Sequence, residues 1–175
     1  VILGGGEPFA WPGDLLALAA EARTRGLLVQ VGTNAIALPD GFERLACFDR
    51  WILPLESTRS EVHDLLRHHG PGHHALVLER LAVLRAAGRA VTVSTVLTAH
   101  NTQGLEELAH FLCDYHAHSG RLHAWHLYQF LPFGRGGTRH RAELEIPAEA
   151  YHEACERIAR LTLPFRVYRR GNMYR

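Results

Sequence analysis

The chain contains no lysine among its 175 residues, only three cysteines, one methionine and no long hydrophobic run. Schiff-base enzymes need a lysine amine, so the first absence argues against lysine-dependent aldol chemistry. No apolar stretch is long enough to cross a bilayer, and we therefore expect no membrane partner. The net charge of only +1 gives no electrostatic reason to expect nucleic acid as a partner.

The three cysteines, Cys47, Cys113 and Cys155, are far apart in the sequence and odd in number. They match neither a disulfide framework nor the ligand spacing of a metal site. We therefore expect free thiols, which are typical of a protein in the reducing cytoplasm.

Histidine, by contrast, is abundant, with 13 in the chain and four of them within residues 68–74. Imidazole ligands at such short spacing can chelate a metal ion. The intervening Gly70-Pro71-Gly72 is, however, typical of an exposed turn without a preorganised ligand shell. The sequence therefore favours a solvated turn, with a metal site as the alternative.

Hydrophobic and charged fractions of 47% and 21% indicate one globular domain or a large piece of one. Hydrophobic periodicity predicts strands and helices in alternation. Strands are expected at residues 1–3, 27–31, 51–55, 91–97, 122–130 and 164–168. Helices are expected at residues 14–24, 41–46, 75–87, 104–116 and 147–161, with a long polar connection over residues 56–74.

This alternation predicts an α/β fold with a parallel sheet, either part of a (βα) barrel or an open doubly wound sheet. Both architectures place ligand sites after the strands, and the loops richest in glycine and polar residues do follow the predicted strands. Pro54 cannot donate to a strand ladder, so we expect it at the end of its strand.

The first predicted strand runs straight into the glycine turn Gly4–Pro8. Such a turn lets the backbone approach a ligand, and the Glu7 carboxylate can accept hydrogen bonds from an ammonium group. A purely structural turn is the alternative. After the next strand, Thr33 and Asn34 offer a hydroxyl and an amide, or else form a helix cap or an Asx-turn.

Three later predicted strands also carry candidate site residues at or after their carboxyl ends. Glu56 begins a cluster of polar residues that reaches residue 67 and could form part of a site. The alternative for this cluster is a solvated helix face with spaced ion pairs. Ser94 and Thr95 lie towards the end of the strand at residues 91–97. The stretch at residues 128–132, followed by a glycine-rich loop, suits a stacked aromatic ring, with core packing as the alternative.

The order of these strand ends resembles the core of radical S-adenosylmethionine (radical SAM) enzymes. The matching segments are Gly-Gly-Glu-Pro at 5–8, Thr-Asn at 33–34, the acid at 56, Val-x-Val-x-Thr-Val at 91–96 and Leu-Pro at 131–132. The resemblance implies a partial (βα)6 radical-SAM-type barrel with parallel strands and outer helices over residues 1–175. It implies that the chain begins at the family's second strand, with the first strand and the cluster loop missing.

The resemblance also implies a cofactor site. Gly5, Gly6 and Glu7, with Pro8 fixing the turn, would hold the amino group of S-adenosylmethionine (SAM), with Thr33 and Asn34 beside it. Three residues at the ends of the family's fourth and fifth strands, which are the third and fourth strands predicted here, would bind its ribose and carboxylate: Glu56, Ser94 and Thr95. Gln129, Leu131 and Pro132 would pack on its adenine.

Two features depart from the family pattern. Pro54-Leu55-Glu56 stands where many members carry Ser-x-Asp. The Cys-x3-Cys-x2-Cys loop, which binds a [4Fe-4S] cluster in the family, is absent. We therefore expect this chain to be a fragment whose cluster ligands lie outside it, and expect the fragment alone to be inactive.

The function implied is reductive cleavage of SAM to a 5′-deoxyadenosyl radical, which abstracts hydrogen from a small-molecule or peptide substrate. An electron donor such as a flavodoxin or ferredoxin would be a partner. The stretch Trp125–Pro132 is similar to viperin-like enzymes and to peptide maturases. Two alternatives remain open: a non-catalytic SAM-binding or scaffold module, and an unrelated aldolase- or isomerase-type barrel with Glu7 or Glu56 as general base.

Overall fold

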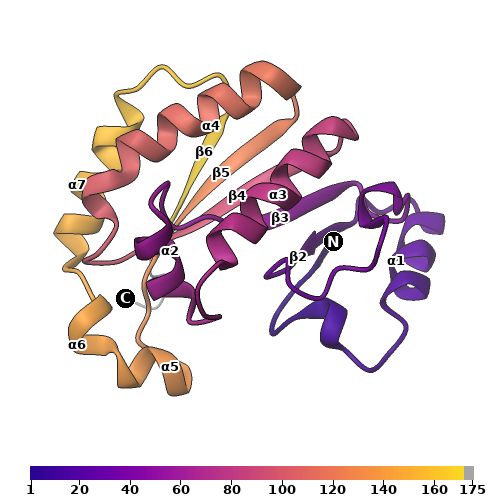
Figure 1. The fold of residues 1–175 in the computed structure, drawn as a ribbon, viewed down its shortest axis with the longest axis horizontal. Helices are drawn as coiled ribbons and strands as arrows, with labels where there is room; N and C mark the ends of the chain where they lie inside the picture. The colour runs from indigo at the N-terminus through magenta and orange to yellow at the C-terminus, as the bar shows by residue number, and fades with distance from the viewer. Residues whose placement is uncertain (172–175) are drawn as a thin grey trace.

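In the computed structural model, residues 1–171 are described, apart from the side chains of residues 134–136. Strands and helices alternate along the chain (Figure 1). The strands are β1 (Ile2–Leu3), β2 (Gln30–Gly32), β3 (Arg50–Pro54), β4 (Ala90–Leu97), β5 (Leu122–Gln129) and β6 (Arg166–Arg170). The helices are α1 (Leu15–Thr24), α2 (Ser60–Arg67), α3 (His73–Ala86), α4 (Leu105–Ser119), α5 (Gly134–Arg139), α6 (Arg141–Leu144) and α7 (Ala148–Ala159). Short 3-10 turns cover Pro8–Ala10, Phe42–Arg44 and Thr102–Gly104.

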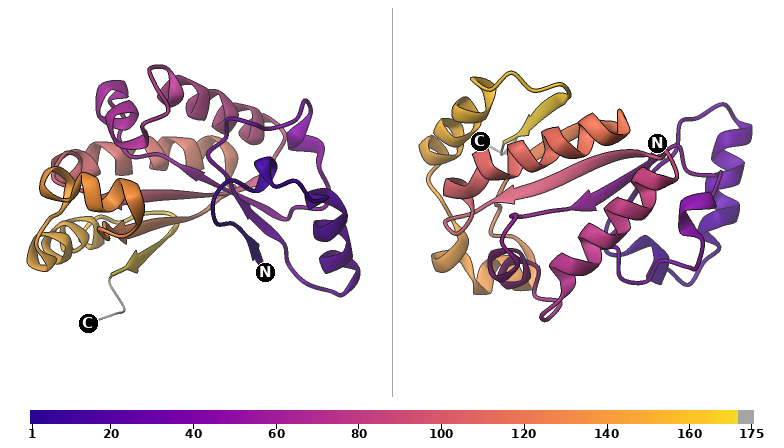
Figure 2. Two further views of the ribbon diagram at one scale, coloured as in Figure 1. Left: turned by 90° about the horizontal axis from the view of Figure 1, so that it is seen from below. Right: turned by 45° about the horizontal axis from the view of Figure 1, so that its top comes forward.

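All six strands are parallel and lie in one sheet in the order in which they follow along the chain. In a doubly wound sheet the order of the strands reverses at a switch point. The order here is continuous, which identifies a partial (βα) barrel. Helices α1, α3, α4 and α7 lie along the outer side of the curved sheet, and β1 and β6 both turn towards its open inner side (Figure 2, left).

The core lies between the sheet and the outer helices. Successive strand residues point to opposite faces, and most outward-facing side chains of β3 to β5 are fully buried. They include Trp51, Leu53, Val93, Trp125 and Leu127. Phe9 stacks on Trp51, with ring centroids 6.0 Å apart, which anchors the segment after β1 to the same core.

Most predicted elements are present, and three expectations were wrong. The connection over residues 56–74 contains α2 and the start of α3. Hydrophobic periodicity did not predict α2, because this mainly polar helix buries only His63 completely. The loop after β5 contains α5. β2 is shorter than expected, since Leu27 and Leu28 are exposed and its neighbour β1 has only two residues to pair with it.

None of the described helices is both long and apolar enough to cross a membrane. Pro54 is the last residue of β3, as expected of a residue that cannot donate to the ladder.

Candidate functional site

The Glu7 carboxylate joins the ends of β1 and β2. Its Oε1 accepts hydrogen bonds from the Thr33 hydroxyl at 2.7 Å and the Phe9 amide at 3.2 Å, and its Oε2 accepts from the Asn34 amide at 2.6 Å. The structure thus brings together two groups of residues that lie 26 positions apart in the sequence. Both oxygens keep lone-pair capacity, so the carboxylate can still accept from a ligand's ammonium group.

The glycines before Glu7 have backbone conformations that other residues rarely adopt. Gly5 and Gly6 have φ values of 86° and 55°, and a Cβ at either position would meet nothing within 4 Å. These two glycines therefore serve the backbone path and leave open space beside Glu7. A hollow of 510 Å³ adjoins this turn; it is lined by Leu3–Pro8, Ala10, Trp11, Leu15 and Leu18.

Thr33 and Asn34 also organise their own loop. The Thr33 hydroxyl accepts from the Ala35 amide at 3.0 Å, and the Asn34 side chain accepts from the Ile36 amide at 2.9 Å. The turn interpretation of these residues is therefore confirmed, and their role in a cofactor site stays a prediction. Because Thr33 both accepts from its loop and donates to Glu7, it fixes the orientation of the carboxylate.

Glu56 is buried after β3 and is held from two sides. Its Oε2 accepts from the Val96 amide at 2.7 Å, and its Oε1 lies 3.2 Å from the Arg67 guanidinium of α2. Burial raises the pKa of the Glu56 carboxyl, while Arg67 and the Val96 hydrogen bond oppose that rise. The predicted ribose contact is thus already engaged in tying α2 to the ends of β3 and β4.

A chain of hydrogen bonds through two histidines links the same strand ends to the β2 loop. The Glu56 amide donates to His63 Nδ1 at 3.1 Å, His63 Nε2 lies 2.9 Å from His73 Nδ1, and His73 Nε2 lies 2.8 Å from the Asn34 carbonyl. An amide only donates and a carbonyl only accepts, so both rings carry their proton on Nε2. Each of these four ring nitrogens therefore has a partner when both histidines are neutral.

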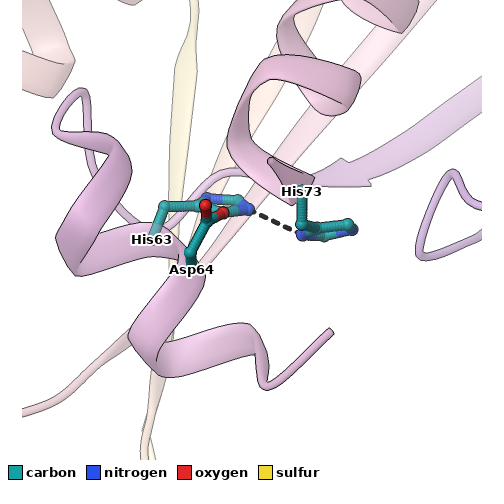
Figure 3. Close-up of side chains that lie close together, drawn as sticks. All are labelled: His63, Asp64 and His73. Carbon is teal, nitrogen blue, oxygen red and sulfur yellow. Dashed lines mark hydrogen bonds between the residues drawn. The ribbon is translucent and has the colours of Figure 1, made fainter. Parts of the chain in front are cut away.

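Figure 3 shows His63, Asp64 and His73, whose donor atoms lie within 4.8 Å of one another, the geometry of a metal site. The ring nitrogens already bind one another and the backbone, however. The Asp64 carboxylate accepts from the Gly72 and His74 amides at 2.8 and 2.7 Å, which caps the start of α3. These contacts favour a structural role over metal binding for this histidine-rich segment.

The carboxyl ends of β3 to β5 border a second cavity of 390 Å³. Its lining includes three residues of the predicted nucleoside site, Glu56, Gln129 and Leu131, together with Val96 and Phe130. Pro132 follows them directly and is partly buried. An apolar cavity with a few polar groups suits a flat aromatic ring.

Ser94 and Thr95 point to opposite faces of β4. Ser94 is partly exposed on the inner face, where its hydroxyl lies 3.4 Å from the Leu53 carbonyl. Thr95 is fully buried on the outer face; its hydroxyl donates to the Leu55 carbonyl at 2.6 Å and accepts from the Trp125 indole at 2.9 Å. The side chain of Thr95 therefore has no access to a ligand, and its expected role as a cofactor contact was wrong.

Sequence reasoning also missed what Asn101 does. Its amide donates to the Glu56 and Val96 carbonyls at 3.0 and 2.9 Å, and its oxygen accepts from the Thr98 amide at 2.8 Å. It therefore clamps the ends of β3 and β4 together rather than capping the next helix. Its place in the loop that follows β4 was the signal available in the sequence, but only the pairing of β3 with β4 in the structure reveals both of its partners.

The described residues do not fit an iron–sulfur cluster, which needs several cysteine thiolates in one place. Cys47 follows the Phe42–Arg44 turn, Cys113 lies in α4 and Cys155 lies in α7. Burial raises the pKa of all three thiols, so they are protonated at neutral pH.

The parallel strands in sequential order and the outer helices define an α/β protein with a partial (βα) barrel. The sequence profile described as the radical SAM superfamily matches residues 1–112, more than half of the chain. The chain belongs to the radical SAM superfamily. That membership removes the unrelated aldolase- or isomerase-type barrel from consideration.

Solved structures with the same fold are only distantly similar in sequence. A domain of pyruvate-formate lyase-activating enzyme from Bacteroides vulgatus is 16% identical, with a TM-score of 0.68 and 98% of each chain covered. Streptococcus suis SuiB is 13% identical with a TM-score of 0.71; the match covers 97% of this chain and 38% of SuiB. SuiB has also been solved bound to S-adenosylmethionine and to its precursor peptide SuiA. No curated protein sequence matched this chain.

Proposed function

We propose that this chain is the SAM-binding part of a radical SAM enzyme, with residues 1–175 forming the core domain from the family's second strand onward. The observation that carries the proposal is the Glu7 carboxylate, held between the β1 and β2 loops beside two left-handed glycines. A fixed carboxylate next to open space suits an ammonium group such as that of SAM.

Each remaining contact is proposed from its position. Gly5, Gly6 and Pro8 shape the turn that presents Glu7, and Thr33 and Asn34 keep its oxygens in place. Ser94 faces the inner side of the sheet and is available to the ribose or carboxylate. The nucleoside would lie in the cavity after β3 to β5, against Glu56, Gln129, Leu131 and Pro132.

When bound, a [4Fe-4S] cluster would supply the electron for reductive cleavage of SAM in a radical SAM enzyme. Since the described cysteines do not fit such a cluster, its ligands would have to be residues other than these. This chain's own part is to bind and orient SAM and to exclude water from it. A flavodoxin or ferredoxin as electron donor, a small-molecule or peptide substrate, and a place in the cytoplasm remain proposals that extend from family membership.

Substitution of Glu7 tests the proposal. Glu7→Gln should weaken SAM binding by about 1.5–3 kcal/mol, or about 10- to 150-fold, because a charged hydrogen bond is lost. Isothermal titration calorimetry on the intact protein would measure this, with thermal unfolding as a check on folding. Glu21→Gln is the matched control, since Glu21 is exposed on α1 and pairs with Arg25. Unchanged affinity in Glu7→Gln would remove Glu7 from the site.

The alternative of a non-catalytic SAM-binding or scaffold module shares the same site. Iron analysis and SAM cleavage by the intact, anaerobically purified protein separate the two. Iron together with cleavage supports the enzyme, whereas SAM binding without either supports the binding module.

A further inference from the structure

The inner face of the sheet carries positive charge at positions that the proposed SAM contacts do not use. Inward-facing residues recur at every second position of a strand. On β3, β5 and β6 this places Arg50, His126, Arg166, Tyr168 and Arg170 on one face. The register sets His126 beside Tyr168, and Tyr128 beside Arg170.

Small side chains lie beside two of these arginines on the sheet. Arg50 pairs across the ladder with Ala90, and Arg166 pairs with Ala124. Within residues 1–171, no helix covers this side of the sheet between the edge strands, as the lower side of the left view in Figure 2 shows. Arg166 and Arg170 are exposed there, and Arg50 is partly exposed.

The arginines of this face lack anionic partners. Among the described residues, none of Arg50, Arg166 and Arg170 takes part in a salt bridge. Arg50 Nη1 donates to the Gln30 side chain at 3.1 Å, but its Nε is buried without a partner. The Thr92 hydroxyl, on the same face, is also buried without a partner.

The acid that acts on Arg50, Asp49, forms its ion pair and its hydrogen bond elsewhere. Asp49 precedes Arg50, but its carboxylate pairs with Arg23 of α1 and accepts from the Val29 amide at 2.7 Å. Arg170 lies over the Tyr168 ring at 5.3 Å, and Arg166 reaches only the Tyr168 hydroxyl at 3.4 Å. The face thus presents uncompensated guanidinium groups and buried unpaired polar atoms, an arrangement that an oxyanion would complete.

We propose that the inner face built from Arg50, Arg166 and Arg170 binds an oxyanion group, a carboxylate or a phosphate, of the substrate. That the ligand is a substrate rests on the proposed function, whereas the oxyanion site itself is inferred from the arginines alone. Planar guanidinium groups recognise both anions through paired N–H donors.

A different role for these charges would be to keep the exposed edge strand β6 from pairing with other chains. That role needs charge on β6 alone and does not explain the buried Nε of Arg50 on β3. Arg169 gives the matched comparison, because it lies on β6 but points to the outer side, where it pairs with Glu156 of α7 at 2.5 Å.

Titration calorimetry of the intact protein with inorganic pyrophosphate and with succinate tests the proposal. Binding of either should weaken about tenfold or more in Arg50→Gln and in Arg166→Gln, the size of a lost charged hydrogen bond. Arg169→Gln should bind as the unsubstituted protein does. Tighter binding of pyrophosphate or of succinate then distinguishes a phosphate from a carboxylate ligand. Absence of binding, or equal loss in Arg169→Gln, would overturn the proposal.

A second readout reports the site directly. Burial, aided by nearby positive charge, lowers the pKa of His126 to about 4. Groups facing it are Arg50, His123, Arg170, Tyr128 and Tyr168. A bound anion should raise this pKa, visible as a shifted histidine titration in NMR. Glu7→Gln should bind the anions normally while its affinity for SAM falls. Loss of anion binding in the arginine variants is therefore measured separately from loss of SAM binding, and the two proposals can fail independently.

Discussion

At the scale of single residues, His63 shows how one buried ring connects distant segments. It accepts from the Glu56 amide and donates to His73, which in turn donates to the Asn34 carbonyl. A proton added to either ring would set two donors against each other. This chain of hydrogen bonds is therefore part of the fold between the β2 and β3 loops.

This arrangement predicts that stability falls as the pH is lowered. Burial, with the nearby charges of His73, His74 and Arg67, lowers the pKa of His63 to about 3. Since an unfolded histidine titrates near 6.5, the unfolded state binds more protons between these values, and each pH unit below 6.5 costs about 1.4 kcal/mol. Urea unfolding at pH 7 and pH 5 should thus differ by about 2 kcal/mol from this group alone.

His63→Gln cannot titrate and should show a flatter dependence of stability on pH, although it is less stable at pH 7. The control is His110→Gln, because His110 is exposed on α4. A slope that is the same in His63→Gln as in the control would contradict the assignment.

At the scale of elements, an ion pair adds to the His63 hydrogen bond in attaching α2 to the end of β3. Arg67 lies near the end of α2 and holds the buried Glu56 carboxylate after β3. The partner side chains are 25% and 3% exposed, so removing either one leaves the other poorly solvated. The cost of breaking such a pair exceeds that of replacing both members.

Arg67→Met should therefore destabilise the fold by about 3 kcal/mol or more, because it leaves a buried carboxylate unpaired. The loss should grow with pH, since the already raised pKa of Glu56 would rise further and its ionisation would cost more. Denaturant unfolding measures both effects. The double variant Arg67→Met/Glu56→Gln should recover much of the loss, and an additive double variant would show that the pair is not coupled.

At the scale of the whole molecule, the half-barrel has an unpaired edge at β1. Ile2 and Leu28, at that edge and beside it, are 60% and 68% exposed, and Trp11 is 50% exposed. Exposed strand edges with apolar side chains pair with other chains.

The 175-residue chain by itself is therefore expected to associate as its concentration rises, which sedimentation velocity measures. Ile2→Lys should reduce association, because a lysine on an edge strand opposes pairing. Ile36→Lys is the control, since Ile36 is 43% exposed but lies in the loop after β2. A monomer at every concentration, or an equal effect of the control, would contradict this prediction.

The sequence determined the alternation of strands and helices, and with it the parallel sheet, because hydrophobic periodicity is a local property that each segment carries by itself. The glycine turn with Glu7, and Thr33 and Asn34 after the next strand, were also readable from the chain, since strand ends collect ligand groups in parallel folds. α2 was predicted only as an alternative to a polar connection, because a helix that buries a histidine and otherwise presents polar side chains looks like a solvated segment.

Only the tertiary structure decided which of these groups are free for a ligand. Thr95 is occupied by the Leu55 carbonyl and the Trp125 indole, whereas Ser94 beside it faces the open inner side. Glu56 is committed to Arg67, and the inner arginines form no salt bridge with any acid among the described residues. These outcomes depend on strand register and on contacts between positions tens of residues apart, and long-range contacts of this kind leave no periodic signal in the sequence.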